Sequence, residues 1–216
     1  IFGFCKQRPD VVGAGRTDTG VHARKMVAHF DQTQKIENEE NLVFRLNSLL
    51  PKDIAVEKVE LVSSDKHARF SARSRTYEYH VMQEKNPFGI ELATRIIGDL
   101  DFDLMNEAAS HLLQYTDFTS FSKLHTDTKT NNCKITEAYW KKREGIWVFT
   151  ITADRFLRNM VRSIVGTLLD VGQKKITVEQ FADIVESKNR QNAGQSISAC
   201  GLSLCDIEYP ANCFEK

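Results

Sequence analysis

The sequence contains no run of about 18 apolar residues, which a membrane-spanning helix would require, and we expect no signal peptide. Its five cysteines are scattered without a CxxC pair, so neither a zinc site nor a disulfide framework is indicated. Net charge is absent too, because 29 Lys and Arg balance 29 Asp and Glu, so any nucleic-acid-binding surface must be local. We expect free thiols in a reducing compartment, hence a cytoplasmic protein with no membrane association.

Of the 216 residues, 41% are hydrophobic and 27% are charged, a composition typical of a globular protein with a core. Strand patterns cover residues 21–30, 54–62, 74–82 and 201–209, and a hairpin around Arg143-Glu144-Gly145 joins 133–142 to 146–153. Helix patterns cover 37–50, a segment after Asp101, 155–172 and 177–187, with Asn38, Asp101 and Thr177 as candidate N-caps. This order favours an α+β fold with a largely antiparallel sheet.

The stretch GAGRTDTGVHARK, residues 13–25, places three glycines around Arg16, Thr17 and Asp18. It lacks the Gly-Lys-Ser/Thr of a Walker loop, and a strand follows it where a dinucleotide-binding loop needs a helix. A carboxylate in the loop would also repel phosphate. Two interpretations remain: Asp18 bonds its own backbone in an Asx turn, or it is held ionised and directed outward near a cation.

Basic residues are interleaved with aromatic ones in KHARFSARSRTYEYH, residues 66–80. Guanidinium groups can hold phosphate while a ring stacks on a base, so the stretch fits an RNA-binding surface. The alternative is a solvated edge beside core tyrosines. We expect Tyr79, which shares a strand face with Tyr77 and Val81, to belong partly to the core.

The segment 155–172 has a wide apolar face, so most of the predicted helix should be buried. Arg155, Arg158 and Arg162 recur on it at spacings of three and four, as one basic ridge. Gly166 follows Arg162 by one turn and would allow close backbone approach. A buried arginine needs a partner such as a carboxylate. Alternatively, the arginine reaches solvent along its apolar stem.

Three stretches together, GAGRTDTGVHA, ARFSARSRTYEY and FLRNMVRSIVGTLLDVG, resemble the signature blocks of the TruA-type tRNA pseudouridine(38–40) synthases. DFTSF (117–121) and GLSL (201–204) also match, so the resemblance covers nearly the whole chain in the right order. It implies isomerisation of uridine to pseudouridine in the anticodon stem-loop of tRNAs, without a cofactor or metal. It also implies two ferredoxin-like α/β halves with an RNA-binding cleft between them, and a homodimer that binds tRNA across both subunits.

The resemblance also implies roles for individual residues. The family's aspartate nucleophile falls on Asp18, the arginine that pairs with it on Arg162, and the tyrosine that packs against the target base on Tyr77. Arg16 falls where RNA must be opened and held. The other candidates for substrate binding are Thr17, His22, Arg69, Arg75, Arg155 and Arg158. Such a scheme requires no general-base histidine.

Members of this family begin with a strand and helix that carry a YDGTxFxGWQ-like block, which is not found in this sequence. The first strand is central in a ferredoxin-like half, and a half without it exposes two strand edges, so we expect roughly the first 40 family residues to be missing here. The two halves are then expected at residues 1–66, without the first strand and helix, and at residues 67–216.

Two other functions stay open. A base-exchanging RNA transglycosylase also uses an aspartate, but it needs a pocket for the incoming base and typically a structural zinc site. A non-catalytic tRNA-binding module needs no carboxylate. For the isomerase, a C–N bond must break and a C–C bond must form, and Asp18 could attack the base, attack the sugar or assist loss of the base. Release of tritium from carbon 5 of uridine distinguishes the isomerase from both alternatives.

Overall fold

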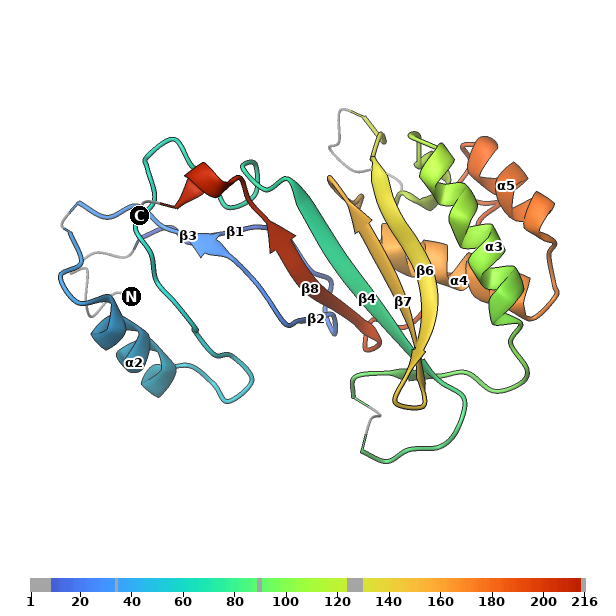
Figure 1. The fold of residues 1–216 in the computed structure, drawn as a ribbon, viewed down its shortest axis with the longest axis horizontal. Coiled ribbons are helices and arrows are strands. Elements are labelled where there is room, and N and C mark those ends of the chain that lie inside the picture. Colours follow the sequence, from blue (N-terminus) through green and yellow to red (C-terminus); the bar gives the residue numbers. More distant parts are fainter. Residues whose placement is uncertain (1–8, 34, 89–90, 124–129, 215–216) are drawn as a thin grey trace. The chain divides into compact units, whose positions relative to one another are not determined.

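The structure is a computed structural model, and it describes residues 9–33, 35–88, 91–123 and 130–214 (Figure 1). The chain forms two compact units. The smaller comprises Ile1–Arg16, Val27–Ala72 and Tyr209–Lys216, and the larger comprises Thr17–Met26 and Arg73–Glu208. The family-based division into 1–66 and 67–216 stays a prediction.

The larger unit is built on a six-stranded sheet with strand order β2-β8-β4-β7-β6, and β5 pairs with one end of β4 (Figure 1). The strands are β2 (His22–Ala23), β4 (Ser74–Met82), β5 (Thr94–Arg95), β6 (Ile135–Arg143), β7 (Ile146–Ala153) and β8 (Leu202–Glu208). The three longest ladders, β4 with β7, β4 with β8 and β6 with β7, are antiparallel, whereas β2–β8 and β4–β5 are parallel. The predicted class, α+β with a mainly antiparallel sheet, is confirmed.

Helices α3 (Phe102–His111), α4 (Met160–Gly172) and α5 (Val178–Glu186) lie on one side of this sheet, with short 3-10 turns at Leu112–Gln114 and Thr119–Phe121 (Figure 1). The core between them includes Tyr79 and Val81 of β4, Phe149 and Ile151 of β7, Met105 of α3, Ile164 of α4 and Phe181 of α5, all fully buried. Tyr77 packs against the same core from a partly buried position. The predicted alternation along β4 is therefore confirmed.

Local signals set the ends of several elements as predicted. The Asp101 carboxylate accepts from Leu104 N at 3.2 Å and caps α3. Thr177 and Gln180 form a reciprocal capping box at the start of α5. The turn between β6 and β7 has positive φ at Glu144 and Gly145, 49° and 81°, which matches the right-handed twist of a hairpin.

The smaller unit contains a short antiparallel pair, β1 (Val12–Gly13) with β3 (Ala28–His29), the helix α2 (Glu39–Leu49), and a 3-10 turn at Ala211–Cys213. Asn38 caps α2 by accepting from Asn41 N at 2.7 Å, and the helix ends just before Pro51, as predicted. Pro51 cannot continue the helix because it has no N–H to donate.

Two predicted strands are wrong. Residues 54–62 form no strand, and the Asn47 side chain bonds both Val56 N and Val56 O, at 2.7 and 2.8 Å, so a side chain satisfies groups that a ladder would otherwise use. Residues 21–30 do not form one strand either. Their ends, β2 and β3, belong to different sheets, and the Arg24 and Lys25 N–H groups both reach Leu204 O. Apolar alternation indicates a strand only where a partner backbone is present.

The helix predicted from residue 155 begins only at Met160. Asn159 stands before it with φ 66° in the left-handed region, which asparagine tolerates better than most residues. Leu157 O accepts from Met160 N at 3.1 Å in the turn that precedes the helix. Arg155 and Arg158 therefore lie outside α4, and the predicted helical ridge of three arginines is wrong.

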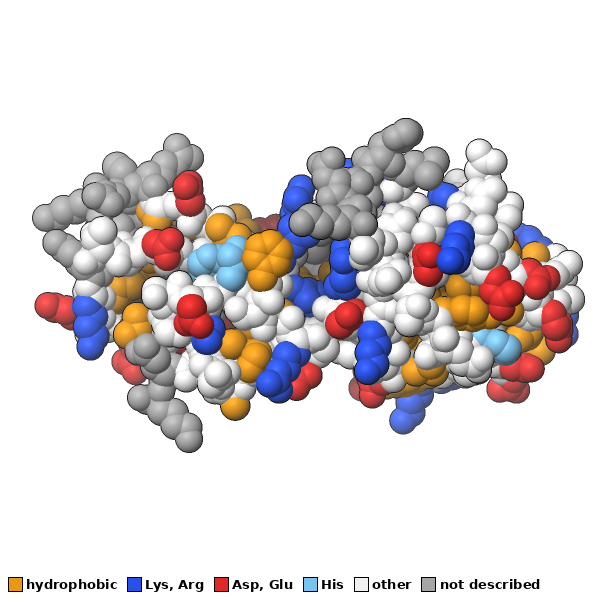
Figure 2. Space-filling view, turned by 90° about the horizontal axis from the view of Figure 1, so that it is seen from above, with side chains coloured by type: hydrophobic (Ala, Val, Ile, Leu, Met, Phe, Trp, Pro, Cys, Tyr) orange, Lys and Arg blue, Asp and Glu red, His pale blue; other side chains and the backbone are white. Residues whose placement is uncertain are grey.

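Within the described residues, no helix has the length and apolar character needed to cross a membrane. Basic and acidic side chains both occur over the surface seen in Figure 2. Cys133, Cys200, Cys205 and Cys213 are free thiols, and burial raises the pKa of Cys133 to about 12. The fifth cysteine, Cys5, lies outside the described residues.

Candidate active site

Asp18 lies in a tight turn at the edge of the larger unit's sheet, just before β2. Val21 N donates to Asp18 O at 3.1 Å, and Gly20 has φ 84°, a conformation that glycine adopts without steric cost. The turn therefore uses the main-chain carbonyl of Asp18 and leaves the carboxylate for other partners. Those partners are arginines, which favours the outward-directed carboxylate over the Asx turn.

Two arginines from the segment around the start of α4 contact the Asp18 carboxylate. Arg162 Nη1 donates to Oδ2 at 3.2 Å, and Arg158 Nε lies 3.8 Å from Oδ1. The side chains of Asp18 and Arg162 are 30% and 21% exposed, so the pair is only partly withdrawn from water. Arg158 is 61% exposed, and an ion pair at that distance and exposure contributes little to stability.

The carboxylate and its arginines line a pocket of about 900 Å³. The lining residues are Thr17, Asp18, Thr19, Lys123, Arg158, Asn159, Arg162 and Arg190. Four of them are cationic and one is acidic, so the pocket has a net positive charge around a single carboxylate. Its volume is in the range that accommodates small-molecule-sized groups such as a nucleotide.

Tyr77 of β4 does not line this pocket and packs against the core. Its ring packs edge-on against the ring of Phe156, with centroids 5.1 Å apart and planes at 85°. Burial raises the pKa of Tyr77; Arg75 opposes this rise, and the negative charge of Asp18 adds to it. The hydroxyl therefore stays protonated above its ordinary titration range.

Comparison with known proteins identifies the family. The sequence model of a family described as tRNA pseudouridine synthase matches residues 108–210. A tRNA pseudouridine synthase A from Parabacteroides distasonis is 55% identical over 204 residues, covering 94% of this chain and 81% of that protein. The proteins of the same name from Bacteroides thetaiotaomicron and Bacillus subtilis are 52% and 41% identical, covering 99% and 94% of this chain and 80% and 83% of theirs. The chain belongs to the tRNA pseudouridine synthase A family.

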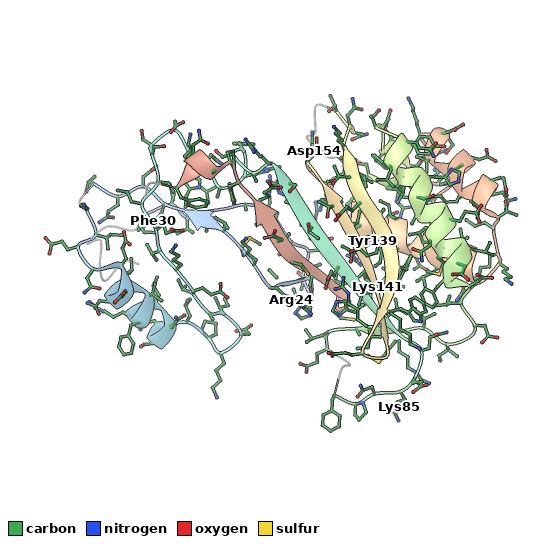
Figure 3. All side chains as sticks on the ribbon, viewed as in Figure 1. Arg24, Phe30, Lys85, Tyr139, Lys141 and Asp154 are labelled. Atoms are coloured by element: carbon green, nitrogen blue, oxygen red, sulfur yellow. The ribbon has the colours of Figure 1, made fainter. Side chains whose placement is uncertain are left out.

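The substrate-binding candidates expected for the tRNA pseudouridine synthase A family are distributed unevenly. Thr17 and Arg158 line the pocket with Asp18 and Arg162. Arg75 Nη1 donates to Asp154 O at 3.0 Å at the end of β7, where Figure 3 labels Asp154. His22 Nε2 lies 3.0 Å from Glu91 O.

The remaining candidates, like Arg75 and His22, do not line this pocket. Arg155 N donates to the Asp154 carboxylate at 2.7 Å, which fixes the start of the segment that leads to Arg158. Arg16 and Arg69 belong to the smaller unit, where both are exposed and the Arg69 guanidinium lies 5.6 Å from the centre of the Phe70 ring. Their roles toward RNA stay predictions.

Four residues that line the pocket were not predicted from the sequence: Thr19, Lys123, Asn159 and Arg190. Lys123 follows the matching block DFTSF, and Arg190 lies in the loop that precedes GLSL. Both therefore stand close to segments that match the family's pattern. Neither falls on a periodic pattern, because both stand in loops that only the tertiary fold brings to α4. Lys123 N, for example, donates to Arg158 O at 3.2 Å.

Proposed function

We propose that this protein isomerises uridine to pseudouridine at positions 38, 39 and 40 of tRNA, with Asp18 as the nucleophile. The observation that carries the proposal is the Asp18 carboxylate, paired with Arg162 in a cationic pocket of a tRNA pseudouridine synthase A family member. A site built only to hold phosphate would exclude a carboxylate, because like charges repel. A nucleophile, in contrast, must be reached by its substrate, and 30% of the Asp18 side chain is exposed.

The reaction is an isomerisation, so every atom of the base is retained except one exchanged proton. The bond between N1 of uracil and C1′ of ribose breaks, the base turns, and a bond between C5 and C1′ forms. The proton on C5 leaves to solvent and N1 gains one. Asp18 supplies an electron pair, either to C1′ or to the uracil ring, and the adduct is resolved when the carboxylate leaves. No water is consumed, so exclusion of water by bound RNA does not hinder the chemistry.

Arg162 has the task of keeping the carboxylate ionised once RNA covers the pocket. Removal of water disfavours a charged group, and a cation at hydrogen-bond distance favours it. Arg162 at 3.2 Å can do this, while Arg158 at 3.8 Å adds a second, more exposed positive charge. Lysine at 162 would retain the charge but lose the planar fork that serves Asp18 and the main chain together.

Tyr77 has the task of receiving the target base. Uridine must leave its stack to reach a carboxylate, which costs a few kcal/mol that stacking on an aromatic ring can offset. The Phe156 ring, edge-on to Tyr77, restricts the ring before RNA arrives. The sugar and phosphates of the same tRNA are assigned to Lys123 and Arg158, together with Arg16, Thr17, His22, Arg69, Arg75 and Arg155. The proposal includes action in the cytoplasm, as a homodimer.

The test uses tRNA that carries tritium at carbon 5 of uridine, with uridine at only one of positions 38, 39 and 40 in each of three substrates. Isomerisation releases tritium as labelled water, which passes through charcoal, whereas free base is retained. A base-exchanging transglycosylase releases labelled uracil, and a non-catalytic binding module releases neither. Labelled water from these substrates, and none from a tRNA without uridine at the three positions, is the expected result. Absence of labelled water would refute the proposed function.

A further inference from the structure

The guanidinium of Arg162 is held at two points. Its Nη1 meets Asp18, and its Nε donates to Ile197 O at 2.7 Å. A guanidinium is planar, so fixing the direction of Nε–H also fixes the plane in which the Nη groups lie. The carbonyl of Ile197 therefore determines where Arg162 can meet the carboxylate, although Ile197 itself has no contact with Asp18 among the described interactions.

Ile197 belongs to a segment without helix or strand, residues 190–198, here called the 190–198 loop. Several bonds attach it to α4. Ile197 N donates to Arg162 O at 3.2 Å, and Gly194 N donates to the Thr167 hydroxyl at 2.9 Å. A Cβ at Gly166 would lie 1.9 Å from Gln195 O, so the loop approaches α4 more closely than any side chain at 166 permits. The glycine at 166 therefore allows the 190–198 loop to lie directly against α4.

The Ser196 hydroxyl bonds to another residue of this loop, Arg190, and to Asn159, which precedes α4. It accepts from Arg190 Nη2 at 3.1 Å and also from Asn159 Nδ2. Arg190 Nη1 additionally donates to Ala193 O and Gly194 O, at 3.2 and 3.3 Å, so its guanidinium folds its own loop into a compact turn. Ser196 stands next to Ile197, whose carbonyl receives Arg162.

Asn159 supplies an independent observation. It precedes α4 in the N-cap position, yet its side chain makes no capping hydrogen bond to the helix and reaches Ser196 instead. An asparagine at an N-cap ordinarily accepts a hydrogen bond from one of the helix's free N–H groups, which stabilises the helix. Here that stabilisation is given up in favour of a bond to the 190–198 loop, beside two residues that line the pocket, Arg158 and Arg162.

We propose that Ser196, with Arg190 and Asn159, forms a hydrogen-bonded junction that positions Arg162 for Asp18. Ser196 and Arg190 are positioning residues: they act on the reaction through the Ile197 carbonyl. This inference rests on the proposed function for its catalytic consequence, but its geometric consequence, the orientation of Arg162, exists in the free protein.

The first test is Ser196→Ala, which removes the acceptor shared by Arg190 and Asn159. A displacement of about 1 Å in a catalytic group can lower a rate by about a hundredfold, so we expect single-turnover tritium release at saturating tRNA to fall between about tenfold and a hundredfold. The Kd for tRNA should change by less than about twofold, because Ser196 is not assigned to RNA. Ser196→Thr retains a hydroxyl and should keep most of the rate. Ser110→Ala, which removes a hydroxyl bonded to Glu107 O within α3, is the matched control.

A second readout requires no activity. In the free protein, the ¹⁵N–¹H resonance of Arg162 Nε, assigned by its loss in Arg162→Lys, should shift and exchange faster with solvent in Ser196→Ala but not in Ser110→Ala. Asn159→Gly gives a second variant, because glycine keeps the left-handed backbone and removes only the amide donor. It should move the same resonance in the same direction.

Three results would overturn the proposal: an unchanged Arg162 Nε resonance in both variants, an unchanged single-turnover rate in Ser196→Ala, or a loss that appears only in tRNA affinity. The last would mean that Ser196 contacts RNA. If the wild-type protein released no tritium, the proposed function would fail, while the resonance of Arg162 would still decide whether the junction positions it.

Discussion

At the scale of single residues, the Asp18–Arg162 pair is more open than a buried arginine on an apolar helix would suggest. Arg162 was expected either to find a carboxylate inside the core or to reach solvent. It does part of each, since its guanidinium meets Asp18 while about a fifth of its side chain stays exposed, 21%. A pair that is mostly, but not completely, withdrawn from water can hold its charge and still be reached by a substrate, which suits a nucleophile better than complete burial.

Arg162→Met tests how strongly the two residues depend on each other. Removing one partner of a fully buried pair costs about 3–5 kcal/mol, so for this partly exposed pair we expect a smaller loss, about 1–2 kcal/mol, together with loss of isomerisation. Asp18→Asn should likewise leave the arginine without its carboxylate. The double variant should be more stable than the sum of the two losses, as measured by urea unfolding. Coupling below about 0.5 kcal/mol would contradict the pairing.

Glu78 offers a pH-dependent test on the face of β4 opposite Tyr77 and Tyr79. Burial raises the pKa of this carboxyl, but hydrogen bonds from His80 and Arg143 outweigh burial and leave it below its usual value. A carboxyl with a lowered pKa stabilises the fold above its unfolded-state pKa, about 4.3, and this stabilisation is lost as the pH falls through the folded-state value.

We therefore expect the free energy of unfolding to decrease from about pH 5 downward, and Glu78→Gln to remove part of that decrease. Glu107→Gln, on an exposed position of α3, is the control for removal of an acid. Urea unfolding at a series of pH values checks this. If the free energy of unfolding falls equally steeply with decreasing pH in wild type and Glu78→Gln, Glu78 does not contribute to the loss of stability in acid.

At the scale of elements, α4 is the part on which the site depends most. Ala is favoured over Gly in a helix by about 1 kcal/mol, so Gly166→Ala should stabilise α4 if only propensity mattered. The added Cβ would meet Gln195 O at 1.9 Å, a main-chain atom that cannot move aside alone. We expect a net loss of about 1–3 kcal/mol and a lower rate, because the 190–198 loop carries Ile197.

Gly172→Ala is the control for Gly166→Ala, since its new Cβ would meet the flexible end of the Met105 side chain at 2.4 Å. It should cost less stability and leave tritium release at saturating tRNA unchanged. Thermal and urea unfolding measure the first effect. A Gly166→Ala protein as stable and active as wild type would show that the loop does not depend on the small residue.

The elements that could be predicted from sequence are those with local causes. Strand β4, the β6–β7 hairpin and the capped helices α2, α3 and α5 follow from alternation, turn residues and N-caps within a few positions. The failures needed distant information. Residues 54–62 have the alternation of a strand but bond to Asn47. The apolar spacing of 155–172 predicts a helix from residue 155, but the left-handed backbone of Asn159 allows α4 to begin only at Met160.

At the scale of the whole molecule, the site is assembled from segments far apart in sequence. Asp18 and Arg162 are separated by 144 positions, and charge reasoning could predict only that such an arginine needs a carboxylate. The family resemblance supplied the particular partner. Lys123 and Arg190 stand outside the matching blocks and carry no periodic signal, so their place in the pocket became visible only in the fold.

The positive pocket makes a prediction about salt. With at least about six phosphate contacts, affinity for tRNA should fall roughly a thousandfold between about 50 and 200 mM salt. Lys123→Ala should reduce the slope of log K against log salt by about 1, because one phosphate contact is lost. Lys141→Ala on β6, labelled in Figure 3, removes a lysine outside the pocket and should leave the slope unchanged. A flat salt response would mean that the pocket cations do not contact RNA.

The central claim is that Asp18 performs chemistry and does not hold RNA. Its most direct test is tritium release by Asp18→Asn at saturating tRNA in a single turnover, beside Asp53→Asn, which removes an exposed acid of the smaller unit. We predict that Asp18→Asn binds tRNA within about threefold of wild type but releases tritium only at background, while Asp53→Asn releases it at the wild-type rate. Appreciable turnover by Asp18→Asn would contradict the account, because no other carboxylate lines the described pocket.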